Sequence, residues 1–224
     1  MKKIISSIAV CSLAICALAS CGSEKSDKSA KSADIAGKWS IDSLENESIE
    51  QGGIIFNDGK GSAYTDSSKM FHFNDEGLVI GSDDDTATRT ISKDLFKEEG
   101  KTLTIDLSGM ELLIMNKLDE TEGYNGTYSL DGGILYEQLS AQISGSEENT
   151  AEAVDITLIF NGDKSEMIFN DLFDYETKDG QLTLSGNSDV MGLSTDGNSA
   201  EYKIEGDKLT IITKNGTETF TRVK

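Results

Sequence analysis

The chain has 224 residues, with 20 lysines and arginines against 40 aspartates and glutamates, so its formal net charge at neutral pH is −20. A charge of this size repels phosphate groups, which argues against nucleic acid or an anionic membrane surface as a partner of the folded body. Hydrophobic residues make up 37% of the chain and recur periodically, so most of the chain is expected to fold, while proline is absent.

The N-terminus has the order of a secretory signal. Met1-Lys2-Lys3 is cationic, and the largely apolar run Ile4–Ala19 is too short for a comfortable membrane span. The next residues complete the stretch Leu18-Ala19-Ser20-Cys21-Gly22, which resembles a bacterial lipobox. The alternative is an ordinary secretory signal in which this cysteine falls by chance.

The lipobox resemblance implies a lipoprotein. Residues 1–20 would be a cleaved signal peptide, and Cys21 would become the first mature residue, carrying a diacylglyceryl group and further acylation of the palmitate type. The protein would then be anchored to the extracytoplasmic face of a bacterial membrane. Cys11 and Cys16 would be removed with the signal. The mature body would therefore have no disulfide, cysteine nucleophile or thiolate metal site.

Residues 21–34 follow as the lipidated cysteine and a tether. Between Gly22 and Asp34 there is no large apolar residue, and the composition is that of a flexible, solvated segment. The folded body is expected to begin at Ile35.

From Ile35 onward the main pattern is an alternation of apolar and polar residues with period two. It is interrupted by Asn-Gly and Asp-Gly turns, which favour tight antiparallel hairpins. The fold class predicted is all-β, in antiparallel meanders, and the clearest hairpin joins 208–213 to 217–223. Ser92–Gly100 could form one or two helical turns with Ser92 as N-cap, and Gly133–Ile143 is ambiguous. Ser144–Ala153 is expected to be an acidic loop. The segments that share one apolar face include Phe71 and Phe73; Leu103, Ile105 and Leu107; Val154, Ile156, Leu158 and Phe160; and Tyr202 and Ile204.

An internal repeat is visible. Gly37-Lys-Trp-Ser-Ile-Asp42 is similar to Gly126-Thr-Tyr-Ser-Leu-Asp131, at an offset of 89 residues. Gly100-Lys-Thr-Leu-Thr-Ile105 is similar to Gly206-Asp-Lys-Leu-Thr-Ile211, at an offset of 106. We therefore expect two related β domains, 35–119 and 123–224, joined by the stretch that begins at Asp119. Chance similarity between short strands, and hence one larger barrel, is the alternative.

Gly37-x-Trp39 at the start of the first strand resembles the opening of lipocalin-like barrels. In that family the tryptophan closes one end of the barrel and a basic residue late in the chain packs across it. Arg222 is the residue in the matching position, where it would make a cation–π contact. The C-terminal hairpins resemble those of small lipocalin-like domains in Gram-positive surface lipoproteins. The resemblance implies the barrel fold and carries no ligand with it.

Few residues offer chemistry. His72 is the only histidine and alternates with Phe71 and Phe73, so it is expected to face away from them, toward solvent. Asp83-Asp84-Asp85 could contribute oxygen ligands to calcium, but no complete calcium loop surrounds it. A solvated charged hairpin is the simpler interpretation. No catalytic residue, metal site or cofactor is therefore expected.

Two functions remain. The first is a non-enzymatic, lipid-anchored module that binds a partner or belongs to an envelope assembly; the partner could be a protein, a glycan or a small apolar ligand. The alternative is a lipocalin-type carrier that holds a small apolar ligand inside a single larger barrel. Two small barrels would fill their interiors with their own side chains, whereas one large barrel could keep a cavity.

Overall fold

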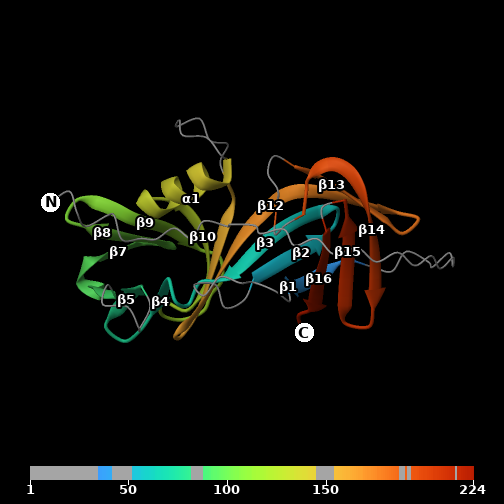
Figure 1. Ribbon diagram of the computed structural model, residues 1–224. Coiled ribbons are helices and arrows are strands. Elements are labelled where there is room, and N and C mark those ends of the chain that lie inside the picture. Colours follow the sequence, from blue (N-terminus) through green and yellow to red (C-terminus); the bar gives the residue numbers. More distant parts are fainter. Residues whose placement is uncertain are drawn as a thin grey trace. The chain divides into compact units, whose positions relative to one another are not determined.

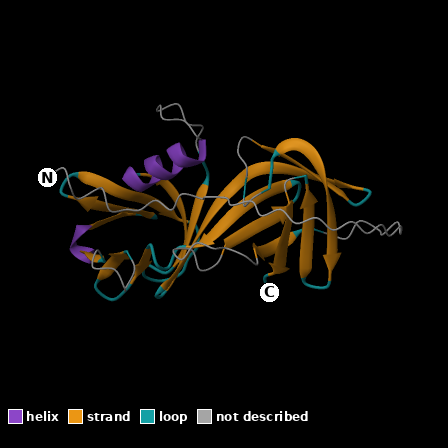
Figure 2. Ribbon diagram, in the orientation of Figure 1, coloured by secondary structure: helices purple, strands orange, loops and turns teal. Residues whose placement is uncertain are grey.

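The computed structural model describes residues 35–41, 52–81, 88–144, 154–186, 190, 193–214 and 216–224. Within them the chain is all-β, antiparallel, with one α-helix (Figure 2). This confirms the predicted fold class. Cys21, the tether, Asp83–Asp85 and the predicted acidic loop after Ser144 lie outside the described residues.

The described residues form two compact units. Unit 1 comprises residues 65–169, and unit 2 comprises residues 35–41, 52–64 and 170–224, apart from the gaps given above. These bounds differ from the consecutive halves 35–119 and 123–224 expected from the repeat, because unit 1 lies between two parts of unit 2 in the sequence. Two strands, β3 (Lys60–Asp66) and β12 (Lys164–Lys178), contribute residues to both units.

Unit 2 is a closed antiparallel barrel of eight strands, consistent with the lipocalin-like barrel predicted. The order around it is β13-β14-β15-β16-β1-β2-β3-β12, and β12 pairs with β13 to close the ring. In Figure 1 the blue and cyan strands and the orange and red strands build it together. The remaining strands of this barrel are β1 (Gly37–Ile41), β2 (Gly52–Asn57), β13 (Gln181–Gly186), β14 (Asp196–Glu205), β15 (Lys208–Thr213) and β16 (Gly216–Arg222).

The interior of this barrel is filled by its own side chains. Phe56 packs edge-on against Phe173, with ring centroids 6.0 Å apart, and against Tyr175 at 4.9 Å. An eight-stranded barrel is wide enough either to be filled by side chains or to hold one small ligand, and here these aromatic rings lie inside it. The fully or almost fully buried apolar residues include Trp39, Ile54, Phe56, Phe173, Leu182, Leu209, Ile211 and Phe220.

Unit 1 is built on a six-stranded sheet in the order β12-β11-β10-β9-β8-β7, together with a three-stranded sheet β4-β5-β6. The helix α1 lies against β9 and β10 (Figure 1). The elements of unit 1 are β4 (Phe71–Phe73), β5 (Gly77–Ile80), β6 (Arg89–Ser92), the 3₁₀ helix η2 (Lys93–Leu95), β7 (Phe96–Glu99), β8 (Thr102–Leu107), β9 (Met110–Lys117), β10 (Gly126–Gly132), α1 (Ile134–Ser144) and β11 (Ile156–Asn161).

The core of unit 1 follows the predicted alternation. Phe71 and Phe73 are both buried, as are Leu103 and Ile105 on β8, and Ile156, Leu158 and Phe160 on β11. Leu135 and Leu139 extend this core from α1. The ambiguous segment after Gly133 is therefore helical because two leucines four residues apart lie on one helix face and can be buried against the sheet.

The segment Ser92–Gly100 is only partly helical. Ser92 is an N-cap, as predicted, and its hydroxyl oxygen accepts a hydrogen bond from the Asp94 N–H at 3.3 Å. The helix ends after a single 3₁₀ turn, because Phe96 pairs with Ile105 and the chain continues as β7. Gly100, expected to end the helix, instead lies in the β7–β8 turn at φ +65°.

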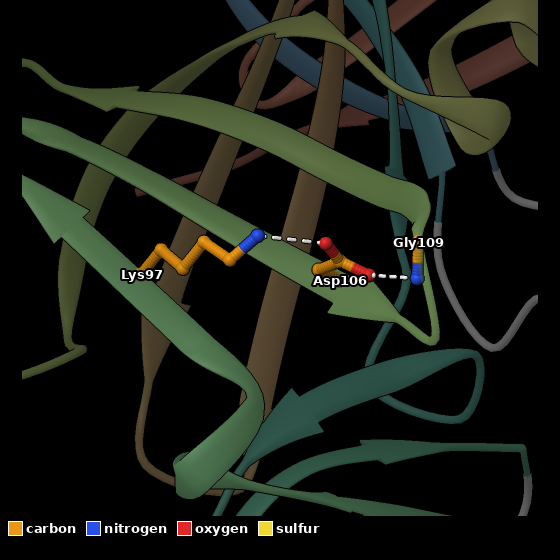
Figure 3. Close-up of polar contacts among 3 residues, drawn as sticks. All are labelled: Lys97, Asp106 and Gly109. Carbon is orange, nitrogen blue, oxygen red and sulfur yellow. Dashed lines mark hydrogen bonds and ion pairs between the residues drawn. The ribbon is translucent and has the colours of Figure 1, made fainter.

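The Asp106 carboxylate on β8 links β7 to the β8–β9 turn (Figure 3). The Lys97 Nζ donates to Asp106 Oδ2 at 2.8 Å, and the other oxygen of Asp106 accepts the Gly109 N–H at 2.6 Å. Ser108 and Gly109 both have positive φ, as a tight hairpin turn requires. The hydrogen bond from Lys97 and that from Gly109 lower the pKa of Asp106, so the carboxylate stays ionised at neutral pH.

Candidate functional site

His72 lies on β4 and contacts the main chain through its imidazole ring. It points away from the buried Phe71 and Phe73, as predicted, and is half-buried. Its Nδ1 lies 2.9 Å from the backbone carbonyl oxygen of Ser68, not from a hydroxyl. The nearby Ser165 hydroxyl is 2.8 Å from that of Ser67 and donates to the Phe71 carbonyl at 2.5 Å. The hydrogen bonds of these serines join the connection between β3 and β4, and β4 itself, to β12.

Trp39 and Arg222 lie together at one end of the unit 2 barrel, as the resemblance to lipocalin-like barrels implied. The guanidinium carbon is 4.0 Å from the indole centroid, and Trp39 is fully buried. The indole N–H donates to the Ile35 carbonyl at 2.8 Å, and Arg222 Nη1 donates to the Ala36 carbonyl at 2.8 Å. The indole N–H and the guanidinium group thus both donate to main-chain carbonyls just before β1.

Unit 1 has a cavity of about 280 Å³ that is open to solvent. It is bounded by the β7–β8 turn, by the end of β9 and by the connection from β9 to β10. Leu103 and Tyr128 are its buried lining residues, and the exposed lining residues include Glu98, Lys101 and Glu122. Six of its thirteen lining residues are charged, four of them carboxylates and two of them lysines.

Asp119 organises the connection that forms one side of the cavity. Its Oδ1 accepts the Thr121 N–H at 3.1 Å, and its Oδ2 accepts the Thr127 N–H at 2.7 Å. The hydrogen bond from Thr121 is the main reason that the pKa of Asp119 is lowered to about 2, with that from Thr127 adding to it. The side chain therefore carries a full negative charge at neutral pH and fixes the course of residues 119–127.

Each of the two lysines of the cavity has a polar partner. Lys101 Nζ lies 2.6 Å from Glu120 Oε1 in an exposed ion pair, and Lys117 Nζ donates to the Gly123 carbonyl at 2.6 Å. An exposed ion pair is weak and exchanges readily with water or with another charged group. Lys101 and Glu120 can therefore separate and each contact a polar ligand.

Two tyrosines give the cavity an aromatic wall. The Tyr124 hydroxyl donates to Glu98 Oε1 at 2.9 Å, and the Tyr128 hydroxyl donates to the Tyr124 carbonyl at 3.1 Å. Burial raises the pKa of Tyr124, and it raises that of Tyr128 to about 12, with the charges of Asp119 and Glu98 adding to the latter effect. Both phenols are protonated at neutral pH, which suits hydrogen bonding rather than proton transfer.

The cavity is thus a polar site with aromatic and charged groups. Within the described residues, no group of three or more His, Cys, Asp or Glu side chains is arranged to hold a metal ion. The described part of the chain also contains no helix of the length and hydrophobicity needed to cross a membrane.

Sequence reasoning did not find this cavity. The stretch Asp119–Gly123 was interpreted only as a joint between two repeats. The available signal was its charge: three of its five residues are acidic, and only Leu118 separates it from a strand that ends in Lys117.

Comparison with family models, with curated proteins and with solved structures finds no match.

Proposed function

We propose that the protein is a lipid-anchored, extracytoplasmic lipoprotein whose β body is a non-enzymatic binding or envelope-interaction module. The anchoring part of the proposal is supported by the sequence ending in Cys21, which resembles a lipobox. The polar cavity of unit 1 carries the binding part, because it offers charged and aromatic groups to a partner at the surface. A partner there would be polar, such as a protein segment or a glycan.

The packing of the barrel disfavours the alternative, a carrier of an apolar ligand. Phe56, Phe173 and Tyr175 meet inside unit 2, and the ring of Phe173 lies directly against Gly61. An apolar ligand would have to displace these side chains and their packing energy. Titration with the apolar dye N-phenyl-1-naphthylamine should therefore give no saturable fluorescence. Saturable binding at one dye per protein, with quenching of Trp39, would favour the carrier.

Anchoring is tested by the variant Cys21→Ser in the full-length chain. We expect it to lose incorporation of labelled fatty acid and to leave the membrane fraction. Cys16→Ser is the matched control, since this cysteine lies inside the segment to be removed, and it should remain labelled and membrane-bound. A Cys21→Ser protein that still carries label and sediments with membranes would contradict the proposal.

Binding is tested with a photo-crosslinking amino acid in intact cells. We expect adducts when it replaces the exposed Glu122 at the cavity, and none when it replaces Ile212, which is 46% exposed on unit 2. Equal adducts at both positions, or none at Glu122, would remove the cavity as the binding site.

A further inference from the structure

The same local arrangement occurs once in each unit. Gly37 and Gly126 open β1 and β10 at φ +130° and +122°. Two residues later come Trp39 and Tyr128, both buried. The indole N–H of Trp39 and the hydroxyl of Tyr128 each donate to the backbone carbonyl four residues earlier, at 2.8 and 3.1 Å. These positions are all related by one offset of 89 residues.

The strand beside each aromatic residue repeats as well. Arg222 is the cross-strand partner of Trp39, and Lys117 is that of Tyr128, with the cation 4.0 and 5.5 Å from the ring centroid. The main-chain hydrogen bonds around them match in pairs. In the first pair, the Arg222 N–H donates to the Asp207 carbonyl at 2.7 Å, and the Lys117 N–H donates to the Lys101 carbonyl at 2.9 Å. In the second pair, the Val223 N–H donates to the Lys38 carbonyl at 2.9 Å, and the Leu118 N–H donates to the Thr127 carbonyl at 2.8 Å.

The sequence offset between the two copies changes by one residue at a point where the first copy has an extra residue. Asp207 and Lys101 differ by 106 positions, whereas Arg222 and Lys117 differ by 105. The pairing of β8 with β9 has a bulge between Ile105 and Asp106, in the stretch that separates these positions. A β-bulge adds one residue to one strand. The two arrangements are therefore one repeat, and the first copy has one residue more between the positions of Lys101 and Lys117.

The repeat and the compact units divide the chain differently. In the first copy, β1–β3 belong to unit 2 while β4–β9 belong to unit 1; in the second, β10 and β11 belong to unit 1 while β13–β16 belong to unit 2. The chain changes unit between 64 and 65 in the first copy and between 169 and 170 in the second. Phe56 and Phe160 lie opposite Gly37 and Gly126, which relates β2 to β11 by 104 residues. With this offset of 104 residues, the change of unit after residue 64 corresponds to a change after residue 168, one residue from the observed change after residue 169.

We infer that the chain is a duplicated β-barrel unit whose two copies have exchanged their C-terminal halves within one polypeptide. Each compact unit is a composite of the first half of one copy and the second half of the other, which is why blue and red strands share a barrel in Figure 1. Exchange of identical elements between related partners preserves the native contacts. Neither compact unit takes all of its strands from one copy, so in this structure the two copies fold only together.

A cleavage experiment tests the interlocking. A protease site replaces the exposed residues Glu120–Glu122 of the full-length protein, and the chain is cut after it has folded. Because β1 pairs with β16 and β9 with β10, we expect the two fragments to co-elute in native buffer and to separate only at the denaturant concentration that unfolds them. Two separate folded fragments would overturn the inference.

Engineered disulfides distinguish the arrangements without cleavage. In a Cys21→Ser background, Ser40→Cys with Thr221→Cys should form a disulfide, since these residues are cross-strand partners. Without exchange, Ser40 would lie opposite Asn116, as Ser129 does in unit 1. The control pair Ser40→Cys with Asn116→Cys should stay reduced, as measured by mass spectrometry. A disulfide in the control pair and none in the first would reject the exchange.

Discussion

Arg222 covers the indole of Trp39 from the neighbouring strand, and its guanidinium group also donates to the carbonyl of Ala36. One side chain thus connects the last strand of the chain to the first. The corresponding pair in unit 1, Lys117 and Tyr128, is longer at 5.5 Å.

The variant Arg222→Ala should lower the free energy of unfolding by about 2 kcal/mol, because a cation–π contact and a charged hydrogen bond are lost together. Lys117→Ala is the matched variant in unit 1 and should cost less, since its ammonium group lies farther from the ring and its hydrogen bond, to the Gly123 carbonyl, is exposed to solvent. Urea unfolding followed by circular dichroism measures both. An equal loss for the two variants would contradict this reading of the geometry.

Gly53 should not tolerate alanine. A Cβ at this position would overlap the carbonyl of Trp39 and the main chain of Ser40 on the paired strand, which cannot move independently. We expect Gly53→Ala to destabilise the protein by about 3 kcal/mol or more. Gly206→Asn is the control: its turn has φ +62°, which asparagine accepts, and open space around the Cβ. Thermal unfolding should separate the two, and a stable Gly53→Ala protein would contradict the predicted clash.

Asp119 should make stability depend on acid pH. Its folded pKa of about 2 lies below the ordinary value of 3.8, so the carboxylate form is favoured by folding. The contribution is present above about pH 4 and is lost as the pH falls toward about 2. Wild type should be more stable than Asp119→Asn at neutral pH, and the difference should shrink over that window. A difference that stays constant on acidification would refute the assignment.

Tyr128 should titrate late. Its folded pKa of about 12 exceeds the ordinary value of 10.0, so folding favours the neutral phenol; this contribution is complete below pH 10 and is lost as the pH rises through 12. In a titration of phenolate absorbance, the Tyr128→Phe protein should lack the component that appears last. If the Tyr128→Phe protein instead keeps the last component and lacks an earlier one, the phenol is not buried as the structure has it.

The strands were predictable from sequence because alternation and turn chemistry are local. The faces of Phe71 and Phe73, and of Leu103 and Ile105, follow from period two alone. The contact of Arg222 with Trp39 came from the lipocalin resemblance, since a pairing between the two ends of a chain has no local signal. The helix after Gly133 was ambiguous for the same reason, as burial of Leu135 and Leu139 depends on the sheet beneath them.

The composition of each unit was beyond sequence reasoning. A repeat shows that two segments are alike. It does not show whether a strand pairs with strands of its own copy or with the equivalent strands of the other copy, because both sets offer the same pattern. The cavity was missed because Asp119 organises its connection through hydrogen bonds to the main-chain N–H groups of Thr121 and Thr127, and main-chain donors leave no mark in the residue pattern.

The pairing of β1 with β16 also determines when the unit 2 barrel can fold during synthesis of the chain. Arg222 and its acceptor Ala36 are 186 residues apart, so the unit 2 barrel cannot close until nearly the whole chain is available. Contacts of such long sequence separation make folding slow and leave early strands unpaired for longer. A chain that emerges N-terminus first would hold Trp39 and Ile54 exposed throughout its release. The last strand therefore acts as the closing step of assembly, and a chain that stops before Gly216 would leave the barrel open at its first strand.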